Sequence, residues 1–226
     1  MLQLREIVAR GFLYFSDADN HASIIDGIRL AKSSYQGVRS SVYSHLDVKT
    51  LEEQLAADAS ERRLIVSDGV FSMSGELANL HALKELAQDY NAWLMIDDAH
   101  GIGTLGRNGR GVCEHFDLPL PDIYIGTTSK ALGVAGAFVS GSEPLIKLCR
   151  QRCRSYVFST SMPPSQAAAL SAGLALVPSR VQRLARVVHN LRQRLRANGW
   201  KVVDSPAPII VLPVGAEDAA MECAAQ

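Results

Sequence analysis

Short apolar runs rich in branched or aromatic residues alternate along the chain with longer segments whose apolar positions recur at helical spacing. The runs predict strands at residues 12–15, 38–43, 63–66, 93–96, 123–125 and 137–139. The spacing predicts helices near residues 22–32, 48–57, 77–89, 143–153 and 165–176, and a longer one over about 180–198. This alternation is typical of an α/β fold with a mostly parallel sheet.

Several of the predicted strands end at a small polar or acidic residue. Ligands in open α/β sheets bind just beyond the carboxyl ends of the strands. We therefore expect the chemistry of this chain near residues 16–21, 67–74, 97–101 and 126–130.

The character of the chain changes after Pro178, where an arginine-rich helical segment leads to Gly199 and two short apolar stretches. This change predicts a large domain over residues 1–178. Residues 179–226 are expected to form a linking helix and the beginning of a small α/β domain.

Composition narrows the choice of partners. Among the 226 residues, 23 lysines and arginines balance 23 aspartates and glutamates, and no long basic run occurs. Nucleic acid and a membrane surface are therefore not expected as partners. The N-terminal residues carry charges and no long apolar run, which predicts neither a signal peptide nor a membrane span. The four cysteines lack the spacing of a zinc or redox site, so no metal ion is indicated and the cytoplasm is the expected location.

The segment NAWLMIDDAHG at residues 91–101 holds the first candidate residues. Its apolar strand delivers Asp97, Asp98 and His100 to the end of the sheet, where an acidic pair needs a cationic partner or a metal ion. A protonated pyridine nitrogen is one such partner, because an aspartate beside it lets the ring accept electrons from a carbanion. The alternative is a helix N-cap aspartate next to a structural histidine.

The segment DIYIGTTSKALGVAGAFVSG at residues 122–141 contains a strand, small hydroxyl residues, one lysine and several glycines. Desolvation in such a tight setting destabilises the ammonium group of Lys130, as a Schiff-base amine requires. Thr127 and Ser129 offer hydroxyl groups that can hold a phosphate. The alternative is a lysine in a surface turn.

Two further side chains lie where predicted strands end. Ser72, within SDGVFSMSGE at residues 67–76, is a candidate hydrogen-bond donor to a cofactor, and the alternative is a helix-entry loop whose hydroxyls serve the backbone. His21, within DADNHASIIDG at residues 17–27, is a candidate for stacking on an aromatic ring, although a lone histidine is more often structural.

The segment GIGTLG at residues 101–106 matches the dinucleotide fingerprint GxGxxG. That fingerprint requires a strand directly before it and a helix opening from it. Here DDAH intervenes and RNGRG follows, so the segment predicts a loop and disfavours a nicotinamide-dependent dehydrogenase.

Six motifs occur in the order and approximate spacing of the α-oxoamine synthases: NHASIIDG, DGVFSM, DDAHGIGTLG, GRG, GTTSKALG and YVFSTSMPP. The chain resembles this family over about residues 12–215. Members are fold-type I (aspartate-aminotransferase-like) pyridoxal-phosphate (PLP) enzymes that join an amino acid to an acyl thioester with loss of carbon dioxide. The resemblance implies PLP as the cofactor and a homodimer as the assembly.

The resemblance also implies roles for individual residues. Lys130 resembles the lysine that forms the Schiff base and, once freed, removes a proton from the substrate α-carbon. Asp97 resembles the partner of the ring nitrogen, and His100 the residue near the phenolic oxygen.

Three more positions match cofactor or substrate contacts of the family. His21 resembles the imidazole that stacks on the ring and meets the substrate. Ser72 and Thr127 resemble further cofactor ligands, with Thr127 on the phosphate side.

Within the family, DDAHG and GIGTLG most resemble the biotin-pathway member, which condenses alanine with a pimeloyl thioester on coenzyme A or acyl carrier protein. NHASIIDG and ANL are equally similar to the member that acetylates glycine, which normally has a serine in place of Ala99. The resemblance therefore implies the biotin-pathway reaction as the leading expectation, with the acetylation of glycine as the alternative.

The chain departs from the family pattern in three ways. Ser74 stands where the family has an aspartate. The family has a long segment before NHAS, which includes a phosphate-holding glycine turn and a substrate-binding arginine, and it continues past residue 226. The chain is therefore expected to be truncated at both ends, and an inactive remnant is the alternative to a working enzyme.

Overall fold

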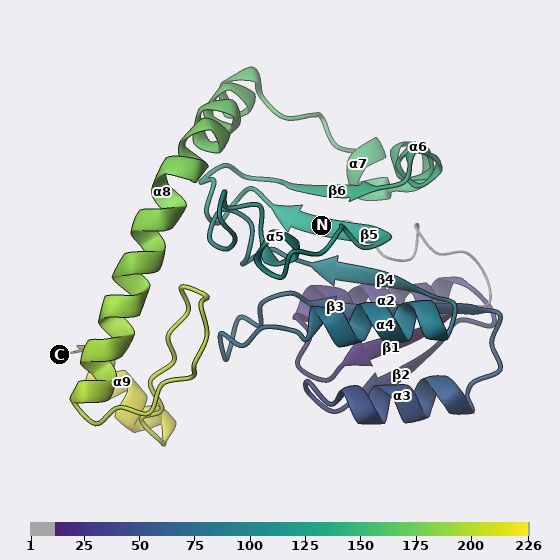
Figure 1. The fold of residues 1–226 in the computed structure, drawn as a ribbon. Coiled ribbons are helices and arrows are strands. Elements are labelled where there is room, and N and C mark those ends of the chain that lie inside the picture. The colour runs from purple at the N-terminus through teal and green to yellow at the C-terminus, as the bar shows by residue number, and fades with distance from the viewer. Residues whose placement is uncertain (1–11, 226) are drawn as a thin grey trace.

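The structure is a computed structural model that describes residues 12–225. Its centre is a six-stranded sheet in the order β2-β1-β3-β4-β5-β6 (Figure 1). The strands are β1 (Phe12–Asp17), β2 (Arg39–Tyr43), β3 (Arg62–Asp68), β4 (Ala92–Asp97), β5 (Ile123–Thr127) and β6 (Ala137–Gly141). Neighbouring strands run parallel except for β6, which pairs antiparallel with β5. The expected mostly parallel α/β sheet is confirmed.

Helices cover both faces of this sheet (Figure 1). The helices are α2 (Ala22–Ser34), α3 (Val48–Ala57), α4 (Leu80–Asp89), α5 (Val112–His115), α6 (Glu143–Arg152), α7 (Arg154–Val157), α8 (Pro164–Ala197) and α9 (Glu217–Ala225). Helices α3, α4 and α5 pack on one face, while α2 and α6 pack on the other. A parallel sheet that is covered on both faces explains why its strands read as continuous apolar runs.

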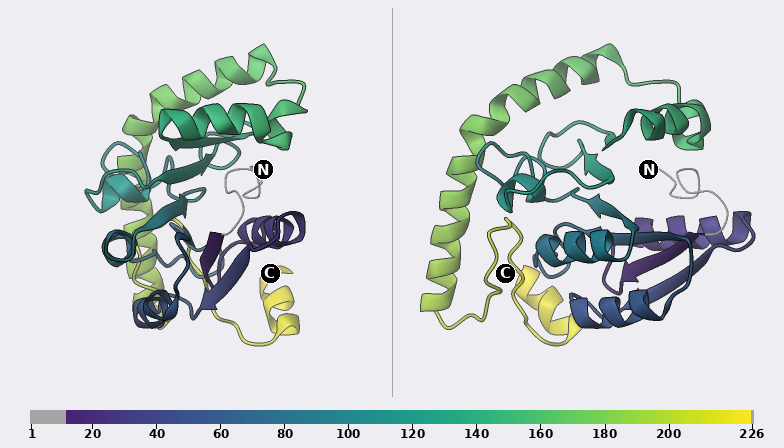
Figure 2. Two further views of the ribbon diagram at one scale, coloured as in Figure 1. Left: turned by 90° about the vertical axis from the view of Figure 1, so that its right-hand side faces the viewer. Right: turned by 45° about the vertical axis from the view of Figure 1, so that its right-hand side comes forward.

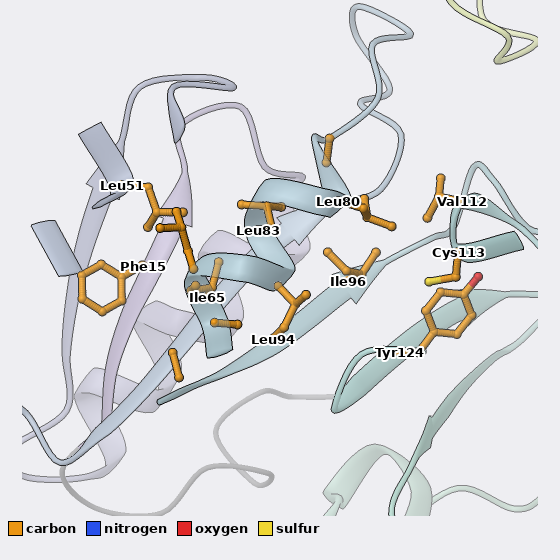
Figure 3. Close-up of a cluster of buried hydrophobic side chains, with 14 of the residues drawn as sticks. Phe15, Leu51, Ile65, Leu80, Leu83, Leu94, Ile96, Val112, Cys113 and Tyr124 are labelled. Carbon is orange, nitrogen blue, oxygen red and sulfur yellow. The ribbon is translucent and has the colours of Figure 1, made fainter. Parts of the chain in front are cut away.

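The side chains of β1 show how one strand supplies both cores. Leu13 and Phe15 point to the cluster under α3 and α4, which Figure 3 shows. Phe12 and Tyr14 point to the opposite cluster under α2 and α6. Each such side chain contributes roughly 1.5–3 kcal/mol when it is fully buried.

Several element boundaries differ from those that the sequence predicts. The strands β1, β3, β4 and β5 each run one or two residues further, so that their last residues are polar. The helix expected from about residue 77 begins at Leu80 instead. Asn79 caps this helix by accepting a hydrogen bond from the Ala82 N–H (3.3 Å), and Leu77 is already paired with Val70 in a β-bridge.

The prediction of separate helices on either side of Pro178 is wrong, because α8 runs through it without a break. A proline inside a helix removes one backbone hydrogen bond, but the turns on either side keep theirs. Val181 and Val188 are buried just beyond the proline and anchor this half of the helix. Helix α8 passes beside the loops that follow the carboxyl ends of the strands, where Gln182 donates a hydrogen bond to the Arg107 carbonyl (2.9 Å; Figures 1 and 2).

Residues 200–216 form neither helix nor strand, so the beginning of a second α/β unit stays a prediction. This segment returns from α8 to the main body of the molecule (Figure 2). Ser205 donates a hydrogen bond to the Gly75 carbonyl (2.5 Å), and Ala207 is fully buried in the core under α4. Gly75 has a φ of +75°, and a side chain there would come within 2.7 Å of the Ile209 carbonyl oxygen.

Among residues 12–225, no helix has the length and apolar character needed to cross a bilayer.

Candidate active site

A cavity of about 410 Å³ opens where the carboxyl ends of β1, β3, β4 and β5 meet. All six residues selected from the sequence line it: His21, Ser72, Asp97, His100, Thr127 and Lys130. They come from four separate segments of the chain. The parallel topology brings these segments together, because parallel strands end at the same edge of the sheet.

Lys130 follows β5 in a turn that is held by backbone and hydroxyl contacts. The Thr128 hydroxyl donates to the Val134 carbonyl (2.7 Å), and the Thr128 N–H donates to the Gly136 carbonyl (2.9 Å). The lysine side chain lines the cavity but is largely exposed, so the expected enclosed setting is wrong. Partial burial of the amine nevertheless lowers the pKa of Lys130, against the attraction of the nearby acids.

His100 is the direct partner of that amine. The Lys130 Nζ lies 2.8 Å from His100 Nε2. Burial lowers the pKa of His100 to about 4, and the charges of Lys130 and His21 act in the same direction. His100 is therefore neutral near pH 7, and its Nε2 accepts a hydrogen bond from the Lys130 ammonium.

Asp97 faces the cavity at the end of β4. Burial raises the pKa of Asp97, and this shift is opposed by the Ala99 N–H, which donates to Asp97 (3.1 Å), and by the charge of Lys130. An anionic Asp97 therefore gains from a positive group in the cavity.

Asp98 does not share this role, so the idea of an acidic pair in the cavity is corrected. Its side chain lies fully buried on the other side, because consecutive residues at a strand end point to opposite faces. Asp98 Oδ2 accepts hydrogen bonds from the Val112 N–H (2.8 Å) and the Tyr124 hydroxyl. Burial raises the pKa of Asp98 to about 7, against these hydrogen bonds. Asp98 thus ties the end of β4 to β5 and to the first residue of α5.

Replacing Tyr124 with phenylalanine tests this structural assignment. The change removes the hydroxyl that donates to buried Asp98 and is expected to cost about 1–3 kcal/mol of unfolding free energy. Urea unfolding measures the loss, and Tyr156→Phe is the control because Tyr156 is exposed. Equal midpoints for the two variants would contradict the assignment of Asp98.

Asp68 is a cavity residue that sequence reasoning missed. It lies at the end of β3, in register with Asp97, and its Oδ2 accepts a hydrogen bond from the His21 N–H (2.7 Å). Burial and, after it, the charge of Asp97 raise the pKa of Asp68 to about 7. The available signal was its place at a predicted strand end, but which acid it adjoins depends on strand pairing.

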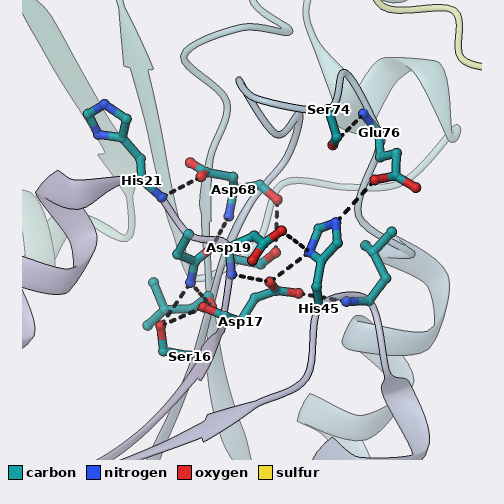
Figure 4. Close-up of polar contacts among 12 residues, drawn as sticks. Ser16, Asp17, Asp19, His21, His45, Asp68, Ser74 and Glu76 are labelled. Atoms are coloured by element: carbon teal, nitrogen blue, oxygen red, sulfur yellow. Dashed lines mark hydrogen bonds and ion pairs between the residues drawn. The ribbon is translucent and has the colours of Figure 1, made fainter. Parts of the chain in front are cut away.

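His21 begins α2 as its N-cap residue. Its Nδ1 accepts a hydrogen bond from the Ser23 N–H (3.2 Å) and lies 2.8 Å from the Ser23 hydroxyl. With Nδ1 turned to Ser23, Nε2 is the ring nitrogen left to face a ligand. Figure 4 shows the ring turned away from Asp68, to which the main-chain N–H of His21 points. The ring is thus exposed beside the cavity.

Hydroxyl groups complete the lining. Ser72 lies in the loop over residues 69–78, and its side chain is half-buried. Thr127 Oγ1 donates to the Gly136 carbonyl (3.0 Å) and lies 2.8 Å from the Ser129 hydroxyl.

The region of residues 101–111 is a loop closed by a bridge between Ile102 and Arg110, which confirms that GIGTLG does not open a helix.

Comparisons with known proteins place the chain in a class. It belongs to the aminotransferase class I and II family, whose model matches residues 8–226. It is 46% identical over 221 residues to an 8-amino-7-oxononanoate synthase of Methylococcus capsulatus, covering 96% of this chain and 56% of that protein. Another 8-amino-7-oxononanoate synthase, from Herminiimonas arsenicoxydans, is 41% identical over 97% of this chain and 58% of its own length. The chain thus spans a little over half the length of these relatives.

Solved structures agree with this placement. A serine palmitoyltransferase of S. paucimobilis, solved with a bound PLP–myriocin aldimine, matches with a TM-score of 0.84 and 29% identity, over 96% of this chain and 57% of that one. The 8-amino-7-oxononanoate synthase of Francisella tularensis matches with a TM-score of 0.80 and 26% identity, over 97% of this chain and 64% of that one. These relatives are α-oxoamine synthases, so the resemblance of the motifs and the fold-type I prediction are confirmed.

Proposed function

We propose that this chain carries the cofactor site of a PLP-dependent acyltransferase of the α-oxoamine synthase type. Such an enzyme condenses an amino acid with an acyl thioester and releases carbon dioxide. The observation that carries the proposal is the meeting of Lys130 and Asp97 in one cavity, at the ends of neighbouring strands. Identity of 46% to a curated 8-amino-7-oxononanoate synthase supports it.

The residues of the cavity fit PLP. Two acids, Asp68 and Asp97, face a space whose described lining includes one lysine and no arginine. Burial raises the pKa of both acids because it destabilises their anionic forms. A cation in the cavity would stabilise these anions and be stabilised by them. A cavity of about 410 Å³ also lies within the range of small-molecule sites. When bound, PLP supplies an aldehyde for the lysine and a protonated ring that accepts electrons from the substrate α-carbon.

The protein side of the reaction follows from the proton positions. A lowered pKa gives Lys130 a larger neutral fraction near pH 7, and only the neutral amine can bond to an aldehyde or take a proton from an α-carbon. Asp97 would hold the proton on the ring nitrogen. Neutral His100 would direct the Lys130 amine through their 2.8 Å contact.

Three further residues would orient the bound groups. His21 would present its ring to the cofactor and the substrate. Ser72 and Thr127 would contact the cofactor, with Thr127 on the phosphate side, where its hydroxyl would turn from the Gly136 carbonyl to the phosphate.

For the substrates we propose alanine and a pimeloyl thioester, carried by coenzyme A or acyl carrier protein. The curated relatives reported above are 8-amino-7-oxononanoate synthases, which supports this choice. The alternative is glycine C-acetyltransferase, which normally has a serine where Ala99 lines the cavity. We further propose a cytoplasmic homodimer as the working form, which rests on the family resemblance and the cysteine pattern.

An assay of the purified chain with PLP tests the function. Alanine or glycine, labelled in the carboxyl group, is combined with pimeloyl- or acetyl-coenzyme A, and labelled carbon dioxide and free thiol are measured together. We expect equal amounts of both products, and a preference of about tenfold or more for alanine with the pimeloyl thioester. PLP fixed on Lys130 without either product would instead support an inactive remnant.

A further inference from the structure

His45 connects two walls of the cavity without lining it. It lies in the loop after β2, where its Nδ1 is 2.9 Å from Asp17 Oδ1 and its Nε2 is 3.3 Å from Glu76 Oε2 (Figure 4). The edge of its ring packs against Phe71, with ring centroids 4.4 Å apart and an interplanar angle of 85°. The imidazole is thus held in one orientation between two carboxylates.

On one side, His45 acts on the turn that leads to His21. Asp17 is buried at the end of β1, and its side chain also accepts hydrogen bonds from the Leu46 and Asp19 N–H groups, both at 2.9 Å. These contacts fix the turn just before the residue that caps α2.

On the other side, His45 acts on the loop that carries Ser72. The Phe71 N–H donates to the Glu76 carbonyl (2.9 Å), and the Gly75 N–H donates to the Phe71 carbonyl (2.8 Å). The loop is therefore closed on itself around Ser72. A shift of Glu76 relative to β1 would move the whole loop against the cavity.

We propose that His45, in its cationic form, is a positioning residue that braces the His21 and Ser72 walls against each other and thereby sets the affinity for PLP. The proposal rests on the proposed function in one respect, namely that PLP is the ligand. The brace itself is a property of the protein alone.

The charges around His45 determine its pH dependence. Asp17 and Asp19 face the ring from the end of β1, with Asp19 Oδ2 at 3.9 Å from Nδ1, and Glu76 faces it from the loop. Burial lowers the pKa of His45, but its bonds to Asp17 and Glu76 and the charge of Asp19 outweigh burial, so the net shift is upward. A raised pKa means that the cation stabilises the fold at low pH. This contribution is lost as the pH rises through the pKa of the folded state.

Two measurements on His45→Gln test the brace. The first is hydrogen exchange of the amides of residues 70–77 without PLP, and the second is the dissociation constant of PLP, both from about pH 6 to about pH 9. At the lowest pH we expect about tenfold faster exchange and about tenfold weaker binding than in the wild type. The difference should shrink as the pH rises, because the wild type then loses the cation that the variant never had. His189→Gln, on an exposed position of α8, should behave as the wild type.

Glu76→Gln is the second variant, for use if His45→Gln proves too unstable to measure. It keeps an acceptor for His45 but removes the charge, and it should speed exchange of the same amides. Unchanged exchange at residues 70–77 in both variants at the lowest pH would overturn the proposal. If the variants exchanged faster at residues 70–77 but the wild type bound no PLP, the bracing role of His45 would be supported and the proposed PLP function would be rejected. If His45→Gln bound PLP as tightly as the wild type, and its exchange at residues 70–77 differed from the wild type by the same factor at every pH, His45 would act only through packing. That result would also overturn the proposal.

Discussion

Lys130→Ala should retain no PLP after borohydride reduction, and its acyltransferase activity should fall by about 10⁴-fold or more, because no other amine lines the described cavity. The wild type should show an absorbance band that reduction converts into a fixed adduct. Mass spectrometry of the reduced protein should place that adduct on Lys130.

Lys147→Ala is the matched control for this experiment. Lys147 lies on the surface of α6, where its side chain is 70% exposed and pairs with Glu143. It should behave as the wild type in both spectrum and adduct. A single fixed adduct that persists in Lys130→Ala would show that another residue binds the cofactor, and an adduct scattered over surface lysines would show that the cavity does not bind PLP.

Asp97→Asn is expected to lower the reaction rate by about 10²–10³-fold while the fold is retained, because an amide cannot stabilise a positive charge in the cavity as a carboxylate does. The same change should alter the neighbouring amine. The charge of Asp97 raises the pKa of Lys130, so its removal should lower that pKa further. The neutral fraction of Lys130 at a given pH then increases.

The pH dependence of adduct formation separates these two effects. In Asp97→Asn, the pH at which borohydride fixes half of the maximal adduct should move downward, even though catalysis is slower. Asp89→Asn, at an exposed position of α4, should leave both the rate and the pH profile unchanged. A slower variant with an unshifted profile would mean that Asp97 does not act on Lys130.

Local sequence patterns were sufficient for the strands and for most helices. Burial on both faces makes each parallel strand a continuous apolar run, and this can be recognised without knowing its neighbours. The polar residue that ends such a run is then a candidate site residue, as Asp97 was. Because all parallel strands end at one edge, His21, Ser72 and Lys130 could be expected to meet although they are far apart in the chain.

Side-chain direction and strand pairing depended on the tertiary structure. Asp97 and Asp98 are adjacent in sequence, yet only Asp97 faces the cavity, and the second acid there is Asp68 from the neighbouring strand. His45 gave no local signal, since its partners Asp17 and Glu76 lie 28 and 31 residues away.

The sequence by itself therefore determined the order of the six strands and of the longer helices along the chain, the edge of the sheet where the cavity lies, and six residues that line it, but not α5, α7 or α9. Tertiary structure decided which acids are neighbours, how exposed Lys130 is, and that α8 continues through Pro178. The physical reason is that periodicity reflects the burial of each segment separately. Hydrogen bonds and charges between segments depend instead on distances that only the assembled fold fixes.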